Sequence, residues 1–420
     1  MLACRPTAHG YGSAVAEILN TLHLARHLRT SAFFVRPRRP LNHAIFHLVS
    51  PDVPVVPQRG WRAVSLHGAW LRRHAWPDAR AALRTALLLR GKRRLAREGL
   101  SKAARRRTKD LMGRIAAWPA TPPPQPALAA ALAAIDFRRE YAEAPVRVTL
   151  PPREAAAAAR AAAALGIDPG RPIVTLHVRE SGYKVSLGLP ERATDVMRNA
   201  TIARYRPALR WLLAEGFQVV RVGDATCSPL DVDGAIDLTR SPARTEMLEL
   251  WCVKQSRFFL ASDSGPYMAA LLLNTPTLAV NVTALLGGDP LRPGDRYILK
   301  HVTESATSRP LTLGELLAPE YLINFRVPGR YTHHENTADE ILAAVQDMVR
   351  SQAGTVTPTD AQLEFRRRLG ALAGGDAVSS WRGEAGLPAL YVGRGLVSAP
   401  LVARGFDQPF APEDDDDRDR

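Results

Sequence analysis

The chain has 420 residues, 46% of them hydrophobic, and a formal net charge of +15. This length allows two or three domains, each with its own core. The three cysteines have no CxxC or Cys/His spacing, which argues against a disulfide framework or a structural zinc site. The sequence has no signal-peptide pattern and no apolar run of membrane-spanning length, so we expect a soluble intracellular protein.

The positive charge is concentrated in one region. Residues 59–114 hold 17 Lys and Arg against three acidic residues. We expect helices over residues 76–89 and 92–117, and Leu83, Leu87 and Leu88 give the first an apolar stripe beside an Arg-rich face. Such a region favours an anionic partner, either a membrane surface, a lipid-linked phosphate or a nucleic acid. A solvated helical face in an Arg-rich protein explains the charge equally well.

The N-terminal region predicts short α/β elements. A glycine-rich turn, residues 9–13, precedes a helix with apolar residues at helical spacing. Glycine lets backbone N–H groups approach a ligand, although a tight turn between a strand and a helix also needs it. Glu17 lies about one turn inside this helix, where its carboxylate faces a cleft or complements the helix dipole. Residues 31–35 are predicted as a strand, and residues 53–56 as either a short edge strand or a loop, because of their prolines.

A proline-rich linker at residues 119–126 separates this part from a second region. After a predicted strand at 146–150 and an Ala-rich helix at 153–165, strands and helices alternate regularly. The predicted strands are 173–176, 217–222, 257–261 and 277–280, and the predicted helices are 201–215, 245–254, 266–273 and 336–349. This alternation predicts βαβ crossovers and a parallel, doubly wound sheet.

The stretch 172–183, PIVTLHVRESGY, is the centre of this region. A β-prone apolar run that ends in polar residues is typical of a buried parallel strand, and ligands bind at the carboxyl edge of such sheets. His177 and Arg179 are two residues apart and point to the same side of an extended backbone. The planar guanidinium of Arg179 suits a phosphate. A surface Arg beside a core His is the plain alternative.

Polar residues also follow the neighbouring predicted strands. Ser264 and Gly265 begin a helix after the strand at 257–261, where free N–H donors and the absence of a side chain favour phosphate binding. Asp263 precedes them and either binds a sugar hydroxyl or caps the helix. Asp224 and Asn281 end two further strands and are candidates for hydroxyl binding.

Several motifs resemble known glycosyltransferases. HVRESGY (177–183), RNATIARY (198–205), VVRVGD (219–224), the block 258–281 and the helix start ENTADEI (335–341) occur in this order. They are similar to an uncharacterised family of bacterial GT-B glycosyltransferases associated with surface polysaccharides. The SDSGP block also resembles the donor loop of heptosyltransferases, HVR resembles the HxR element of GT-B fucosyltransferases, and GYGSAVAEIL resembles their acceptor-side loop.

The chain departs from these families at several positions. Ser13 stands where the fucosyltransferase loop has Asn, and Ser264 and Tyr267 stand where the heptosyltransferase loop has Thr and His. The identity of the donor therefore does not carry over.

The resemblance implies an α/β, GT-B-like fold of two Rossmann-like domains whose parallel sheets face each other across a cleft. The expected domains are an acceptor-side domain (1–150) with a basic helical insertion (about 59–117), a nucleotide-sugar-binding domain (151–350), and an extension (351–420) with a disordered acidic tail.

The implied reaction is sugar transfer from a nucleotide-activated donor to a glycan or lipid-linked acceptor. Glu17 is the predicted catalytic base, with Glu180 as the alternative. The acceptor-side loop is Gly10, Gly12 and Ser13. The predicted donor-binding residues are His177, Arg179, Tyr183, Asp224, Asp263, Ser264, Gly265 and Asn281. No DxD pair stands at a strand end, so we expect neither a metal nor a cofactor, and the nucleotide sugar is a substrate.

Two other functions remain open at this stage. A nucleotide-sugar epimerase on the same fold would need paired acid and base groups, and no convincing pair is present. A nucleic-acid-binding protein would use the basic region, but this region lacks interleaved aromatic residues and a recognised module. The preferred expectation is a cytoplasmic enzyme, peripheral at the inner membrane through residues 59–114.

Overall fold

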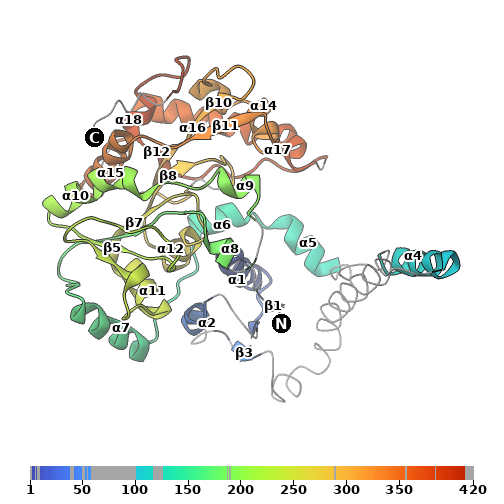
Figure 1. Ribbon diagram of the computed structural model, residues 1–420, viewed down its shortest axis with the longest axis horizontal. Coiled ribbons are helices and arrows are strands. Elements are labelled where there is room, and N and C mark those ends of the chain that lie inside the picture. Colours follow the sequence, from blue (N-terminus) through green and yellow to red (C-terminus); the bar gives the residue numbers. More distant parts are fainter. Residues whose placement is uncertain are drawn as a thin grey trace. The chain divides into compact units, whose positions relative to one another are not determined.

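In the computed structural model the chain divides into two compact units. The first contains Met1–Phe34, Arg39–Val55 and Asp136–Arg420, and the second contains Val35–Arg38 and Val56–Ile135. Figure 1 labels the helices and strands. The structure describes residues 2–4, 6, 10–37, 42–49, 53, 55–57, 101–116, 126–186, 188, 191–287, 290–354, 357–383 and 385–411.

A seven-stranded sheet with the order β12-β9-β8-β7-β4-β5-β6 forms the centre of the first unit. All of its neighbouring strands are parallel. Its strands are β4 (Ile173–His177), β5 (Gln218–Arg221), β6 (Ile236–Asp237), β7 (Ser256–Ala261), β8 (Thr277–Val282), β9 (Arg296–Leu299) and β12 (Leu396–Val397). The predicted α/β class, built on a Rossmann-like parallel sheet, is confirmed.

Helices cover both faces of this sheet, as a doubly wound sheet requires. Val174 and Leu176 of β4 pack into one core, and Ile173 packs into the other, because successive strand residues point to opposite faces. The first core includes α10 (Arg206–Ala214) and α15 (Ala338–Ala353), and the second includes α7 (Pro152–Ala164), α11 (Glu246–Gln255) and α12 (Tyr267–Leu273). These helices correspond to the predicted ones.

The N-terminal elements pack beside α12. β1 (Leu2–Cys4), β2 (Ala32–Arg36) and β3 (Val55–Pro57) form a three-stranded sheet in which β1 and β2 are parallel. Helix α1 (Tyr11–His27) buries Val15, Ile18 and Leu19 in the core that contains α12, and α2 (Ala44–Val49) joins the same core. This packing brings the beginning of α1 to the edge of the large sheet. The strand predicted at 146–150 is wrong, since these residues form no strand.

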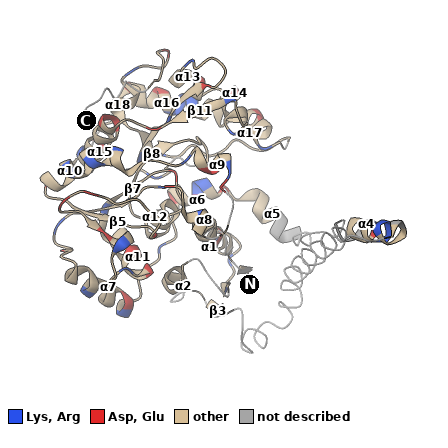
Figure 2. Cartoon of the chain, in the orientation of Figure 1, with Lys and Arg blue, Asp and Glu red and all other residues tan. Residues whose placement is uncertain are grey.

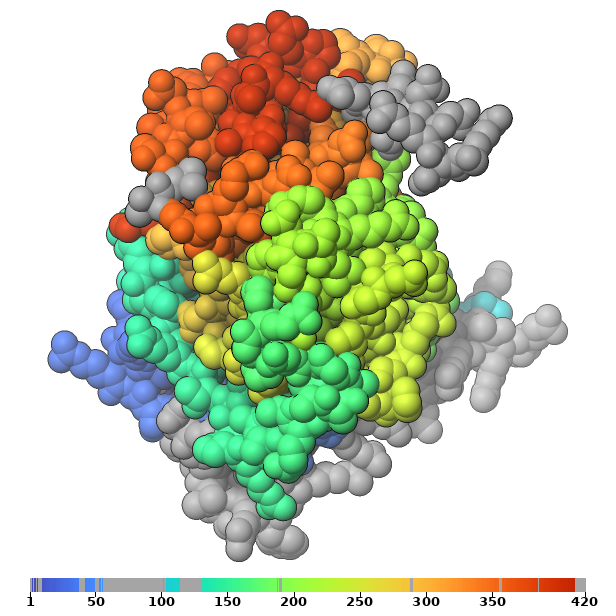
Figure 3. Space-filling view, turned by 90° about the vertical axis from the view of Figure 1, so that its left-hand side faces the viewer, coloured from blue at the N-terminus to red at the C-terminus, as the bar shows by residue number. Residues whose placement is uncertain are grey.

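The C-terminal residues belong to the same fold rather than to a separate extension. β12 pairs with β9 and so extends the central sheet. Figure 3 shows the orange and red C-terminal residues packed directly against the green and yellow residues of the sheet region. Phe365 of α16 (Asp360–Leu372) is fully buried in the main core, which α18 (Ala399–Val402) also joins. The predicted boundary at residue 351 therefore cuts through one core. The acidic tail 413–420 lies outside the described residues.

The remaining elements of the first unit are short. They are α6 (Phe137–Glu143), α8 (Tyr183–Ser186), α9 (Ala193–Val196), β10 (His301–Glu304), α13 (Leu313–Leu316), α14 (Pro319–Asn324), β11 (Tyr331–His334) and α17 (Gly375–Arg382), with two 3-10 helices at Ile202–Tyr205 and Leu238–Arg240. β10 and β11 form an antiparallel pair.

The second unit contains α4 (Lys102–Ala116) and α5 (Pro126–Ala134). Arg105, Arg106, Arg107 and Lys109 of α4 are exposed, and Lys and Arg residues are visible on this helix in Figure 2. The helix predicted at 76–89 and most of the predicted linker at 119–126 lie outside the described residues. Within the described ranges, no helix is both long enough and apolar enough to span a membrane.

Candidate functional site

A cavity of about 600 Å³ lies at the carboxyl edge of the seven-stranded sheet. Its lining includes residues that directly follow β4, β5 and β7, together with the first residues of α1: Gly10, Gly12, Ser13, His177, Arg179, Glu180, Tyr183, Asp224, Asp263, Ser264 and Gly265. Parallel strands bring their carboxyl ends to one edge, which is why residues distant in sequence meet here. Eleven of the predicted site residues thus share one cavity.

The beginning of α1 forms one wall of the cavity. A Cβ atom on Gly12 would lie 2.8 Å from Cα of Gly265, so these two backbones touch only because both residues are glycine. Gly10 caps the helix without a side-chain hydrogen bond, and the first turn contains no acidic residue. The first N–H groups of a helix lack partners within the helix and carry a partial positive charge. This wall therefore favours an anion.

Arg179 forms a second wall. Its backbone N–H donates to Oγ of Ser262 over 2.7 Å, and its guanidinium donates to the carboxylate of Asp195 over 3.1 Å. The side chain is 16% exposed, and its Nε atom is buried with no hydrogen-bond partner among the described residues. Burial and the nearby Arg198 lower the pKa of Arg179 from its ordinary value. An anion in the cavity would accept a hydrogen bond from the Nε atom and would stabilise the charged form of Arg179.

His177 and Ser264 contact each other at the floor of the cavity. Nδ1 of His177 lies 3.0 Å from Oγ of Ser264, so the end of β4 is joined to the loop after β7. Burial, together with the charge of Arg221, lowers the pKa of His177 to about 4. The imidazole is therefore neutral at neutral pH and orients the Ser264 hydroxyl.

Two aspartates bring carboxylates to the cavity. Oδ2 of Asp263 accepts a hydrogen bond from Oγ1 of Thr283 over 2.6 Å, and no side chain caps α12. Helix capping is thus not the role of Asp263. Oδ1 of Asp224 accepts bonds from the backbone N–H and hydroxyl of Thr226. Both carboxylates line the cavity and can accept bonds from hydroxyl groups.

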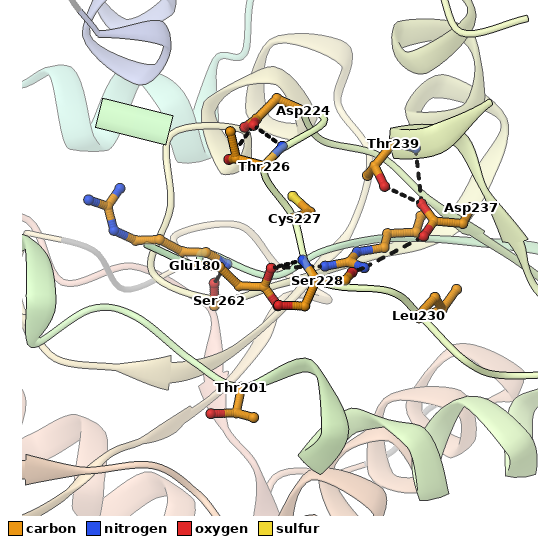
Figure 4. A network of polar contacts seen from close by, with 12 residues as sticks. Glu180, Thr201, Asp224, Thr226, Cys227, Ser228, Leu230, Asp237, Thr239 and Ser262 are labelled. Carbon is orange, nitrogen blue, oxygen red and sulfur yellow. Dashed lines mark hydrogen bonds and ion pairs between the residues drawn. The ribbon is translucent and has the colours of Figure 1, made fainter. Parts of the chain in front are cut away.

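The Glu180 carboxylate contacts a buried cation, and Figure 4 shows Glu180 beside Ser228. Its Oε2 accepts a bond from the backbone N–H of Ser228 over 2.6 Å and lies 3.4 Å from a guanidinium nitrogen of Arg221. The Arg221 side chain has no exposed surface and also contacts Asp237 at 3.7 Å. Through these contacts the Glu180 carboxylate offsets the buried positive charge of Arg221 and holds the loop after β5 in place. These contacts give Glu180 a structural role, and its catalytic role stays a prediction.

Glu17 and Asn281 do not line the cavity. Glu17 lies on the part of α1 beside Cys4, whose thiol contacts the backbone carbonyl of Glu17. Asn281 is fully buried, and its side chain bonds to Tyr205 and to the backbone N–H of Asn336. It connects β8 to the start of α15. The catalytic role of Glu17 and the donor-binding role of Asn281 stay predictions, and both residues lie outside the cavity lining.

Several cavity residues were not predicted. The lining also includes Tyr11, Lys184, Glu191, Arg198, Arg244 and Glu249. Glu249 accepts bonds from the backbone N–H of Gly223 over 3.1 Å and from Nε of Arg244 over 2.8 Å. Burial raises the pKa of Glu249 despite the nearby Arg244. An acidic residue inside the apolar run 247–253 is a sequence signal that could have identified it.

The described residues contain no group of three or more His, Cys, Asp and Glu side chains arranged to hold a metal ion. The expectation of metal independence stays a prediction.

No protein-family model and no curated protein matches the chain. Among solved structures, the glycosyl transferase family 9 protein of Veillonella parvula is 11% identical, with a TM-score of 0.37 over 66% of this chain and 79% of its own. The ADP-heptose lipopolysaccharide heptosyltransferase II of E. coli is 13% identical, with a TM-score of 0.35 over 66% and 84%. The E. coli heptosyltransferase WaaC with ADP is 12% identical, with a TM-score of 0.31 over 71% and 91%. All three are glycosyltransferases, the class that the sequence motifs resemble.

Proposed function

We propose that the chain is a GT-B-like glycosyltransferase that moves a sugar from a nucleotide-activated donor to a cell-surface glycan or lipid-linked acceptor, without a metal ion. One observation carries this proposal. The Arg179 guanidinium, the beginning of α1 and the Ser264-Gly265 backbone line the same cavity. Cationic and N–H donors converging on one space at the carboxyl edge of a parallel sheet favour a phosphate ligand.

The chemical step is a displacement at the anomeric carbon of the donor sugar. An acceptor hydroxyl forms the new C–O bond and gives up its proton, the bond from the anomeric carbon to the phosphate oxygen breaks, and the nucleotide leaves with the bonding electrons. The released proton goes to water or to the departing phosphate. Negative charge develops on the leaving phosphate, so Arg179 and the surrounding N–H groups stabilise the transition state more than the ground state. Asp224 and Asp263 are proposed to accept bonds from donor hydroxyl groups.

The basic residues are proposed to bring the enzyme to its acceptor. Residues 59–114 carry most of the excess positive charge, and the described part of α4 exposes four cationic side chains. Each Lys or Arg near an anionic bilayer contributes about 1 kcal/mol to binding. A peripheral position at the inner membrane would bring the enzyme to the membrane that holds a lipid-linked acceptor.

The proposal is tested by incubating the full chain with UDP-, GDP-, ADP-, dTDP- and CMP-sugars and measuring nucleotide release. One donor should be consumed, and Arg179→Ala should lower kcat/KM by about 100-fold, the size found when one transition-state donor is lost. Arg210→Ala, which changes an exposed Arg on α10, is the matched control. Donor turnover that is equal in Arg179→Ala and Arg210→Ala would contradict the proposal.

A further inference from the structure

Asp195 is surrounded by three cationic side chains. It lies in α9 and is 3% exposed. Its Oδ1 accepts bonds from Arg179 and Arg198, both over 3.1 Å, and its Oδ2 accepts bonds from Nζ of Lys184 over 2.5 Å and from the backbone N–H of Arg192 over 3.0 Å. One carboxylate thus holds three cations, two from the stretch 179–184 and one from the residues that follow α9.

The cations face the cavity, whereas the carboxylate lies behind them. Arg179, Lys184 and Arg198 all line the cavity, and Asp195 does not. The cations are 16%, 30% and 33% exposed, against 4% for the Asp195 side chain. Asp195 binds all three cations and offsets one of their three positive charges. Two further carboxylates lie nearby: Asp263 is 3.9 Å from Arg198, and Glu191 acts on Arg179 and lines the cavity. The cluster therefore offers the cavity three cationic donor groups held around one carboxylate.

The three cations stay together only because the Asp195 carboxylate lies between them. Three cations repel one another, and without a common partner they would separate toward solvent. A hydrogen-bonded anion at the centre fixes their positions before the ligand arrives, which removes part of the ordering cost of binding. Two guanidinium forks and one ammonium group provide more donors than a single phosphate group requires.

We propose that Asp195 is a positioning residue that gathers Arg179, Lys184 and Arg198 into one clamp for a diphosphate. This inference rests on the proposed glycosyltransferase function and makes its donor more specific. The donor is a nucleoside diphosphate sugar rather than a nucleoside monophosphate sugar, because the clamp has cations for two phosphate groups.

The test measures Kd of the full chain by titration calorimetry for UMP and UDP, GMP and GDP, AMP and ADP, and CMP and CDP. For the nucleoside that binds, the diphosphate should bind at least 10-fold more tightly than the monophosphate. Lys184→Gln and Arg198→Gln should each lower diphosphate affinity about 10-fold, because a charge-assisted contact to phosphate is lost, and should lower monophosphate affinity much less.

The Asp195→Asn variant distinguishes a positioning role of Asp195 from a purely electrostatic one. If Asp195 only offsets positive charge, then its neutralisation increases the positive potential and tightens the binding of both nucleotides. If it positions the clamp, diphosphate affinity falls about 10-fold although a negative charge has been removed. Asp233→Asn, at an exposed aspartate outside the cavity, is the matched control and should change neither affinity. Circular dichroism checks the fold, and if Asp195→Asn does not fold, the Lys184 and Arg198 variants decide.

Each outcome has a separate meaning. Weaker diphosphate binding in these variants supports the clamp. Nucleotide binding with equal mono- and diphosphate affinity, or tighter binding in Asp195→Asn, overturns the inference and leaves the proposed function intact. If no nucleotide binds to the folded wild-type chain, the proposed function fails, and the inference fails with it.

Discussion

Gly12 and Gly265, 253 positions apart in the sequence, meet backbone to backbone at the cavity. A Cβ atom on Gly12 would lie 2.8 Å from Cα of Gly265, and one on Gly265 would lie 2.9 Å from the backbone nitrogen of Gly12. No ordinary contact is this short, so any side chain at either position must push α1 away from the loop after β7.

We expect Gly12→Ala to destabilise the protein by about 2 kcal/mol, the usual cost of overpacking a close contact, and to weaken nucleotide binding, because the two walls separate. Urea unfolding and calorimetry measure the two effects. Gly370→Ala, on an exposed face of α16 with no atom near the added methyl group, is the control and should stabilise the helix slightly. Unchanged stability in Gly12→Ala would refute the close packing.

The position of Glu180 beside buried Arg221 predicts a stability effect rather than a purely catalytic one. Glu180→Gln should lower the free energy of unfolding by about 3 kcal/mol, since removing one partner leaves a buried cation poorly compensated. Glu364→Gln breaks an exposed ion pair on α16 and should change stability little. A Glu180→Gln variant of wild-type stability that has lost all transferase activity would contradict this and would support Glu180 as the catalytic base.

His177 predicts a loss of stability in acid. Its pKa is about 4 in the folded protein against 6.5 for a free imidazole, so between these values the unfolded state binds more protons. The stabilising contribution is therefore complete above pH 6.5 and is lost as the pH falls toward 4, by about 2 kcal/mol between pH 7 and pH 5.

Urea unfolding of His177→Gln at pH 7 and pH 5 measures this contribution. Between pH 7 and pH 5, the free energy of unfolding of the variant should fall by about 2 kcal/mol less than that of wild type. The variant should still show the loss of stability that comes from His333, because burial also lowers the pKa of His333 to about 4. Equal losses in the two proteins would show that His177 does not remain neutral in the folded state.

The exposed cations of α4 predict salt-sensitive binding to anionic vesicles. The triple variant R105Q/R106Q/R107Q should bind phosphatidylglycerol vesicles more weakly, by up to about 3 kcal/mol at low ionic strength, as measured by co-sedimentation. The variant R153Q/R160Q/R210Q removes the same number of exposed charges elsewhere and should bind like wild type. Equal binding of both variants would exclude α4 from the membrane contact.

Much of the central fold could be predicted because its signals are local. The apolar runs that became β4 and β7 are each followed by polar residues, and parallel strands must place those residues at one edge. Arg179 and Ser264 were placed in the cavity by this rule alone. β12 was missed because a two-residue strand has no periodicity to detect.

The other features of the site could not be predicted, because they depend on tertiary contacts that a local sequence pattern does not encode. Nothing in the sequence around Asp195 indicates that it binds Arg179, and nothing around Arg221 indicates that it forms an ion pair with Glu180. Glu17 was expected either to face the cavity or to complement the helix dipole, and the packing of α1 leaves it out of the cavity lining, with its backbone carbonyl beside Cys4. Tertiary packing decides which polar residue of a helix faces a ligand, and the helical period alone leaves that choice open.

The most direct test of the account is nucleotide binding to the anion site. Thermal unfolding of wild type, Arg179→Gln and Arg210→Gln is followed with UDP, GDP, ADP and CDP. Ligand that binds only the folded state stabilises it by about 2.7 kcal/mol at 100 times its Kd. The account predicts that one nucleotide raises Tm of wild type and Arg210→Gln by several degrees but leaves Arg179→Gln nearly unchanged. An equal rise in all three proteins, or in none, would contradict it.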